Sequence, residues 1–411
     1  MSSSLPAHVP AWLQAAYTTP RVKVALKALA ERENARTKFR AGHIKSARNA
    51  AKETGVVQST AANISSHFHN SDPSNYYSIL SGLSQENMQR NRYMDVIPYD
   101  RTLVVAKGLG AGTGSEAYLN ANWVQEKYGK RWWIASQAPL QNTAYTFLSL
   151  LLDDDEYPPE SKSHSASQPR TVVQLTQTIE SGRRKAHPYF PDIVGQTMII
   201  VSDSPSDPSS PIRKLKVTLL SQEKLPNARC VKSIVEVRPV GAPIPKPTIF
   251  THLLFIAWPD QSVPSPSDRA ALFEFVRLVD QVNRSPPVHP RHNTNNNTPD
   301  DLDPPIVVGC SAGIGRTGSF IAISSLLRHA GFFTQSSPIA SKFFSIQSGN
   351  SDNNSSSPLP PFPSSLSDDL VACEIDSLRE QRAGMVQRPE QAVLVYEMLV
   401  GAYVERRDGM R

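Results

Sequence analysis

The stretch "VVGCSAGIGRTG", residues 307–318, places one cysteine, Cys310, between an apolar run and a glycine-rich turn that enters a predicted helix. A loop that leaves a strand and enters a helix turns successive backbone N–H groups inward, so it forms an anion-binding nest at the positive end of the helix dipole. Gly313 and Gly315 permit the tight backbone of such a nest. A nest of this kind lowers the pKa of a thiol from about 8.5 toward values at which the thiolate exists near neutral pH. The stretch therefore predicts a nucleophilic cysteine at the end of a strand.

Two residues after the turn add phosphate chemistry. Arg316, six positions after Cys310, carries a guanidinium that can bind two phosphate oxygens at once, and Thr317 can donate to the sulfur or to a reaction oxygen. A nucleotide-binding loop is the alternative, but that loop needs four residues between its glycines, followed by Lys-Ser or Lys-Thr. Gly309 and Gly315 enclose five residues and Arg316 follows, so spacing and residue type exclude it. The spacing of Cys310 and Arg316 alone still leaves open an inert cysteine buried at a strand end.

The pattern around this stretch predicts an α/β fold. From about residue 76 the chain alternates short β-branched runs with helical segments, which is typical of a mixed sheet covered by helices. The clearest runs are "TVVQLT" (171–176), "TMIIVS" (197–202), "RKLKVTLLS" (213–221), "IFTHLLFIAW" (249–258) and "PIVVGC" (305–310).

Several segments are too polar to join a core. Stretches rich in Ser, Pro and Asn at 158–170, 203–213, 283–304 and 334–369 cannot bury enough apolar surface to offset chain entropy, so we expect disordered loop insertions there. Residues 1–75 are expected to form an extension, partly helical and partly disordered, before a domain at 76–408. Its helix is predicted at 20–40, opened by Pro20 and followed by a linker. This basic helix is either a solvated or edge-packing helix, or a docking element for an acidic partner.

Composition limits the function classes. The 411 residues carry 43 Lys and Arg against 37 Asp and Glu, and no dense basic block is interleaved with aromatics, so nucleic acid is not an expected partner. The cysteines at 230, 310 and 373 lack metal-ligand spacing, which favours free thiols in a reducing compartment. No apolar signal core and no membrane-length apolar run occur. We expect a cytoplasmic protein, with the nucleus as a second location, and the oligomeric state stays open.

The whole loop, Cys310-Ser-Ala-Gly-Ile-Gly-Arg316-Thr-Gly, resembles the signature loop of the cysteine-dependent protein tyrosine phosphatases. The resemblance runs in order from about residue 80 to 405. It implies a highly twisted mixed sheet flanked by helices, attack of the thiolate on phosphorus, a phosphocysteine intermediate, and hydrolysis by water without a metal or cofactor. The phosphate-binding residues that it implies are Ser311, Ala312, Gly313, Ile314, Gly315 and Arg316.

A second motif, "FIAWPDQSVPSPSD", places Asp260 in a proline-bounded turn about fifty residues before Cys310. A lone Trp-Pro-Asp is usually an ordinary turn with a packed tryptophan. Its position before the cysteine makes it similar to the mobile acid loop of the same family. The resemblance implies that Asp260 protonates the leaving phenolate and then, as a carboxylate, activates water.

The motif "NRYMDVIPYDRT" contains Tyr93, which can stack on a substrate ring, and Asp95, which can accept hydrogen bonds from a peptide backbone. It resembles the phosphotyrosine-recognition loop of the family, with Asn91 and Arg92 as supporting residues. Such a loop implies a slot too deep for phosphoserine to reach Cys310. By itself the segment is typical of a solvated turn.

Two further segments gain a role only from the resemblance. In "MVQRPEQAVLVYEML", Gln387 is expected to position the hydrolytic water, and Gln391 supports it and contacts substrate. In "TIESGRRKAHPYFP", Glu180 is expected to orient Arg316, and Lys185 to meet the acid loop and the substrate. Taken alone, the two glutamines are typical of surface positions at a helix start, and Glu180 and Lys185 are typical of a surface charge cluster.

The residue before the nucleophile, Gly309, departs from the family pattern, in which a histidine normally lies there. The loss is expected to raise the thiol pKa and to slow the enzyme, and restoring histidine is expected to raise turnover. An inactive or weakly active phosphotyrosine-binding pseudophosphatase is one alternative, and a dual-specificity or lipid phosphatase is another. The resemblance implies tyrosine-phosphorylated proteins as partners, with MAP kinases as candidates because "PRVKVALKAL" loosely resembles kinase-docking peptides.

Overall fold

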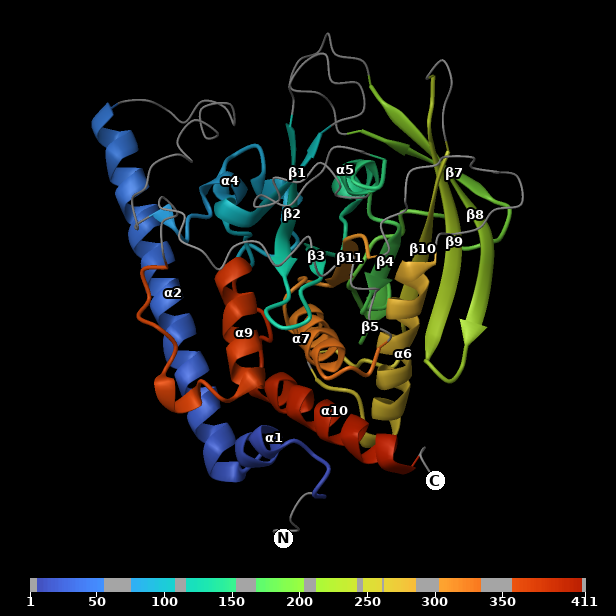
Figure 1. Ribbon diagram of the computed structural model, residues 1–411. Coiled ribbons are helices and arrows are strands. Elements are labelled where there is room, and N and C mark those ends of the chain that lie inside the picture. Colours follow the sequence, from blue (N-terminus) through green and yellow to red (C-terminus); the bar gives the residue numbers. More distant parts are fainter. Residues whose placement is uncertain are drawn as a thin grey trace.

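A computed structural model describes residues 6–54, 75–107, 116–152, 168–202, 212–241, 247–260, 262–285, 303–333 and 357–408. Within these ranges one nine-stranded sheet crosses the molecule in the order β1-β2-β3-β11-β4-β10-β9-β8-β7 (Figure 1). The bounds of these strands are β1 Leu103–Lys107, β2 Glu116–Gln125, β3 Trp132–Gln137, β4 Thr171–Gln174, β7 Thr197–Val201, β8 Lys214–Leu225, β9 Cys230–Pro239, β10 Thr248–Phe255 and β11 Ile306–Cys310. A separate two-stranded hairpin joins β5 (Ile179–Glu180) and β6 (Arg183–Arg184).

The sheet is mixed, which confirms the predicted α/β class. The central strands β3, β11, β4 and β10 run parallel, whereas the outer strands pair antiparallel. Strand β11 is apolar without alternation because both of its faces are covered. Ile306 and Val308 pack in one buried cluster and Val307 in another on the opposite face.

Helices cover both faces of the sheet (Figure 1). The helices α6 (Pro266–Arg284), α7 (Gly315–His329), α9 (Leu370–Gln381) and α10 (Pro389–Asp408) contribute to the first cluster, and α5 (Ala144–Ser149) contributes to the second. The short elements are α4 (Leu80–Leu83), η2 (Met88–Arg90), η3 (Asp100–Thr102), η4 (Gln141–Thr143) and η5 (Ser364–Leu366). Among the described residues, no helix combines the length and the apolar character needed to cross a bilayer.

The N-terminal residues pack into the body of the molecule. Helix α1 (Ala11–Ala16) leads into α2 (Thr19–Thr54), which lies beside α9 (Figure 1). Leu13 and Leu29 belong to the same buried cluster as Cys310. The linker predicted directly after residue 40 is wrong up to Thr54, because residues 41–54 are rich in the helix-forming residues Ala, Lys and Arg. Residues 55–74 lie outside the described part of the chain.

The four predicted insertions overlap segments outside the described residues, namely 158–167, 203–211, 286–302 and 334–356. Disorder is wrong for 357–369, which the structure shows packed. Leu366 is buried, and Asp369 caps α9 by accepting from the backbone N–H of Ala372 at 3.0 Å. The prolines of this segment restrict the unfolded chain, so a small apolar contact is enough to order it.

Candidate active site

Cys310 is the last residue of β11, and the turn after it enters α7 at Gly315. The turn closes tightly because Gly313 has a φ of +72°, where a side chain is strained. A Cβ at Gly313 would also lie 2.2 Å from the carbonyl oxygen of Ser136 on β3. The glycine lets the turn press against the neighbouring strand, so the backbone N–H groups face the sulfur.

The surroundings of Cys310 favour its thiolate. Burial opposes ionisation, but the charge of Arg316, the Thr317 hydroxyl and the backbone N–H groups of Thr317 and Gly313 together lower the pKa of this thiol. The Thr317 hydroxyl has no partner of good hydrogen-bond geometry in the described residues, which leaves it for the sulfur. Cys230 shows the contrast, because burial raises its pKa to about 12 although a backbone hydrogen bond from Leu254 and the charge of Lys232 oppose the rise.

Arg316 is held in place by Glu180 and by the backbone of Leu175. Glu180 accepts from Nη1 and Nη2 of Arg316, both at 2.7 Å, and the carbonyl of Leu175 accepts from Nη1 at 2.8 Å. A paired fork of this kind fixes the guanidinium plane. The β5–β6 hairpin therefore places Glu180 where the resemblance implies it.

Asp260 bridges two cations in the site. Its carboxylate accepts from Nη2 of Arg316 at 2.9 Å and pairs with Nζ of Lys185 at 2.5 Å. Partial burial opposes the charge, yet Lys185 and Arg316 lower the pKa of Asp260 below its usual value. The acid loop is anchored at Trp258, whose Nε1 donates to the carbonyl of Ser262 at 3.0 Å. The carboxyl group of Asp260 therefore contacts the guanidinium of Arg316.

The tyrosine loop reaches the same site. The hydroxyl of Tyr93 lies 2.8 Å from Oγ of Ser311. Arg92 pins the loop by donating to the carbonyls of Ala138 and Pro139. Asn91 donates to the carbonyl of Gly82 and accepts from the Tyr118 hydroxyl and from Nδ2 of Asn120. Asp95 and its neighbour Met94 are exposed.

The two glutamines differ in their surroundings. Gln387 is exposed, at the end of a turn whose Val386 has a φ of +53°. Gln391 is buried, and its Oε1 accepts from the backbone N–H of Arg388 at 3.1 Å. The amide of Gln391 packs on Gly315, where a Cβ would lie 3.0 Å from its Nε2. Gln391 therefore lies behind the start of α7, whereas Gln387 is free to reach a ligand.

Sequence reasoning missed Arg382, which holds the cysteine loop from behind. It is 1% exposed, and it donates from Nε to the carbonyl of Gly313 at 2.8 Å and from Nη2 to the carbonyl of Ala312 at 3.1 Å. Because these carbonyls point at Arg382, the backbone N–H groups of the cysteine loop are free to face the Cys310 sulfur. The signal in the sequence was a pair of arginines three residues apart, Arg379 and Arg382, ending a helix just before Gln387.

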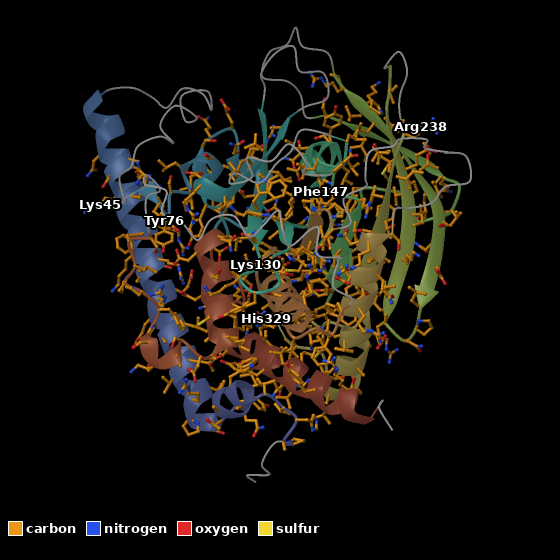
Figure 2. All side chains as sticks on the ribbon, in the orientation of Figure 1. Lys45, Tyr76, Lys130, Phe147, Arg238 and His329 are labelled. Carbon is orange, nitrogen blue, oxygen red and sulfur yellow. The ribbon has the colours of Figure 1, made fainter. Side chains whose placement is uncertain are left out.

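Close packing against β3 accounts for a glycine, rather than a histidine, at position 309. Gly309 pairs with Ser136 on β3, and a Cβ on Gly309 would lie 2.7 Å from the Ser136 carbonyl oxygen. A cavity of about 20 Å³, large enough for one water, borders Gly309 and Cys310. Phe147, labelled in Figure 2, and Tyr189 form part of its wall. The thiol pKa stays low without a histidine because the cation and the N–H groups remain.

Gly309→His is therefore expected to lower stability before it can restore activity. Overpacking between two parallel strands costs about 1–3 kcal/mol, so the melting temperature falls for Gly309→His and also for Gly309→Ala. Gly42→Ala is the matched control, because Gly42 lies in α2 with open space around it and alanine favours a helix. Calorimetry of the three variants checks this. A Gly309→His protein that melts like the parent and turns over faster would contradict it.

The comparison with known families agrees with this geometry. The sequence model described as Protein-tyrosine phosphatase matches residues 87–336, more than half of the chain. The chain belongs to the protein-tyrosine phosphatase family. The matched range contains Tyr93, Asp260, Cys310 and Arg316, and it ends before Gln387.

Curated relatives of the chain include receptor and non-receptor types. The chain is 30% identical to receptor-type tyrosine-protein phosphatase eta of Gallus gallus over 243 residues, 59% of this chain and 14% of the relative. It is 28% identical to tyrosine-protein phosphatase non-receptor type 13 of Homo sapiens over 329 residues, 78% of this chain and 10% of the relative. It is 27% identical to the human non-receptor type 4 protein over 328 residues, 78% of this chain and 26% of the relative. The chain thus spans between a tenth and about a quarter of the length of these relatives.

Proposed function

We propose that this chain is an active protein-tyrosine phosphatase that hydrolyses phosphotyrosine in proteins through a phosphocysteine on Cys310. One observation carries the proposal. A buried cysteine with a lowered thiol pKa lies beside an arginine that Glu180 orients and that Asp260 contacts. Nucleophile, phosphate ligand and acid therefore come together in a single site.

The first chemical step uses Cys310 and Asp260. Arg316 and the backbone N–H groups of the loop bind the phosphate oxygens, and the Cys310 thiolate attacks phosphorus in line with the tyrosine oxygen. The sulfur–phosphorus bond forms as the phosphorus–oxygen bond breaks, and the Asp260 carboxyl gives its proton to the departing phenolate. The product is a neutral tyrosine and a phosphocysteine.

The second step returns the enzyme to its starting state. Asp260, now a carboxylate, takes a proton from a water molecule that attacks the phosphocysteine. The exposed amide of Gln387 is the group that we assign to orienting this water. Inorganic phosphate leaves and the thiolate is regenerated.

The contact between Asp260 and Arg316 explains how the acid becomes protonated. With an empty phosphate site, Arg316 and Lys185 stabilise the carboxylate. A phosphate dianion that binds Arg316 replaces Asp260 as the partner of the guanidinium. It also places negative charge near Asp260, and both effects raise the pKa of the carboxyl group. Substrate binding thereby favours the acid form that the first step needs.

A comparison of phosphopeptides tests the proposal. Two peptides of one sequence, carrying phosphotyrosine or phosphoserine, are assayed for phosphate release. Because the hydroxyl of Tyr93 lies 2.8 Å from Oγ of Ser311, we assign its ring as one wall of the substrate slot and expect kcat/KM for phosphoserine to be at least about 100-fold lower. Equal rates would favour a dual-specificity phosphatase, and tight binding of phosphotyrosine without turnover would favour a pseudophosphatase.

Tyrosine-phosphorylated proteins are the proposed substrates, in the cytoplasm or the nucleus. MAP kinases stay among the candidates, but we do not assign their docking to residues 20–29. Leu29 is buried, and Val22 and Leu26 pack against the same core. Three of the aliphatic side chains that a docking groove would read therefore pack against this protein, and among the aliphatic residues of the stretch Val24 is exposed.

A further inference from the structure

The loop that carries Gln387 is held by a second arginine, Arg379 of α9. Arg379 donates from Nε to the carbonyl of Met385 at 2.8 Å and from Nη2 to the carbonyl of Val386 at 2.7 Å. The backbone N–H of Val386 donates in turn to the carbonyl of Ile314 in the cysteine loop at 3.2 Å. The position of Gln387 relative to the cysteine loop therefore depends on Arg379.

Helix α2 completes the surroundings of Arg379. The carbonyl of Leu29 accepts from Nη1 of Arg379 at 2.9 Å. Arg379 is buried and donates to three backbone carbonyls, so its charge is balanced by charges that act through space. Burial lowers the pKa of this guanidinium, and the charges of Glu33 on α2 and Asp376 on α9 oppose that effect. Helix α2 thus supplies both a hydrogen-bond acceptor and a compensating charge.

Arg36 fixes α2 on α9. Its side chain is fully buried, and Nη2 lies 2.6 Å from Asp376 and 2.6 Å from Glu380. The hydroxyl of Tyr77 also donates to Glu380, at 2.8 Å. Buried ion pairs require close geometry to offset their desolvation, so this cluster sets one register between the helices. The ring of Tyr76, labelled in Figure 2, packs edge-on against the ring of Tyr77, with the centroids 4.9 Å apart.

We propose that α2 is a positioning element of the catalytic site. Arg36 sets the register of α2 on α9, the Leu29 carbonyl holds Arg379, and Arg379 holds the loop of Gln387. This inference rests on the proposed function for its kinetic consequence. A displacement of about 1 Å in a group that orients a reactant can cost about 100-fold in rate. Because Gln387 serves the water, hydrolysis of the phosphocysteine slows more than its formation.

The test uses the full chain with Arg36→Met, Arg36→Lys and the control Lys38→Met. Lys38 is exposed on the same helix, two residues from Arg36. We expect kcat per folded molecule of Arg36→Met to fall about 10-fold or more, and the fraction of enzyme trapped as phosphocysteine by acid quench to rise. Arg36→Lys is expected to lie between Arg36→Met and the parent, and Lys38→Met to match the parent.

A second readout does not depend on turnover. Amide hydrogen exchange at Val386 is expected to be faster in Arg36→Met than in Lys38→Met, because the hydrogen bonds from Arg379 to the carbonyls of that loop weaken. Unchanged exchange, or an unchanged phosphocysteine fraction and kcat, overturns the inference. If Arg36→Met does not fold, Glu380→Gln is measured in the same way, since it keeps the shape and weakens the pair. A parent without turnover refutes the proposed function instead, and hydrogen exchange still decides this inference.

Discussion

Replacing Cys310 by serine is expected to lower kcat on a phosphotyrosine peptide by about 10⁵-fold or more. The thiolate is the nucleophile, and a serine hydroxyl stays protonated in the same nest because its pKa is far higher than that of a thiol. The Arg316 fork and the backbone N–H groups are unchanged, so the variant keeps its affinity for the phosphopeptide. Steady-state assays of phosphate release and calorimetric titration with the peptide measure the two quantities.

Cys373→Ser is the matched control for this experiment. Cys373 is half-buried, and burial raises its pKa, so its replacement leaves kcat unchanged. Alkylation by iodoacetate at neutral pH gives an independent check, because only a thiolate reacts quickly. Cys310 is expected to be labelled before Cys230. If Cys310→Ser kept more than a trace of the parent's activity, the phosphocysteine route would be excluded.

Replacing Asp260 by alanine has the second largest expected effect. Loss of a general acid costs about 10²–10⁴-fold in rate when the leaving group is a poor one. Tyrosine leaves as a phenolate whose conjugate acid has a pKa of about 10, so it needs the proton. A nitrophenyl phosphate carries a better leaving group, and its hydrolysis is expected to lose much less. Assays of both substrates with Asp260→Ala and with the exposed control Asp192→Ala measure the difference.

The pH dependence of kcat/KM tests whether Asp260 acts in its protonated form. Lys185 and Arg316 lower the pKa of Asp260 in the free enzyme, so its acid form is lost as pH rises. Above pH about 6.5 the substrate phosphate is already a dianion, and kcat/KM of the parent is expected to fall with increasing pH. In Asp260→Ala that fall is absent, because the group that titrates has been removed. A falling limb that persists in the variant would show that another acid controls it.

The role proposed for the loop of Cys310 could be predicted from the sequence because its chemistry is local. Cys310 and Arg316 lie six residues apart in one strand-turn-helix unit, and the nest is formed by the backbone of that same unit. The motifs around Asp260 and Tyr93 needed a resemblance to gain a role, since a turn with an acid or a tyrosine is common. The structure places both beside the cysteine loop through Arg316 and Ser311. The α/β class followed from strands alternating with helices.

The contacts that hold the site in place could not be predicted from the sequence, because their partners are far apart in the chain. Arg36 meets Asp376 across 340 residues, and nothing near either residue indicates the pairing. The same holds for Gly309, whose fit depends on the carbonyl of Ser136 on another strand. For the basic helix predicted at 20–40, the sequence left open a solvated helix, an edge-packing helix and a docking element, because composition does not reveal which face is covered. Local backbone geometry and residue chemistry determined the nucleophile and its phosphate ligand, whereas the packing of distant elements alone decided what holds them in place.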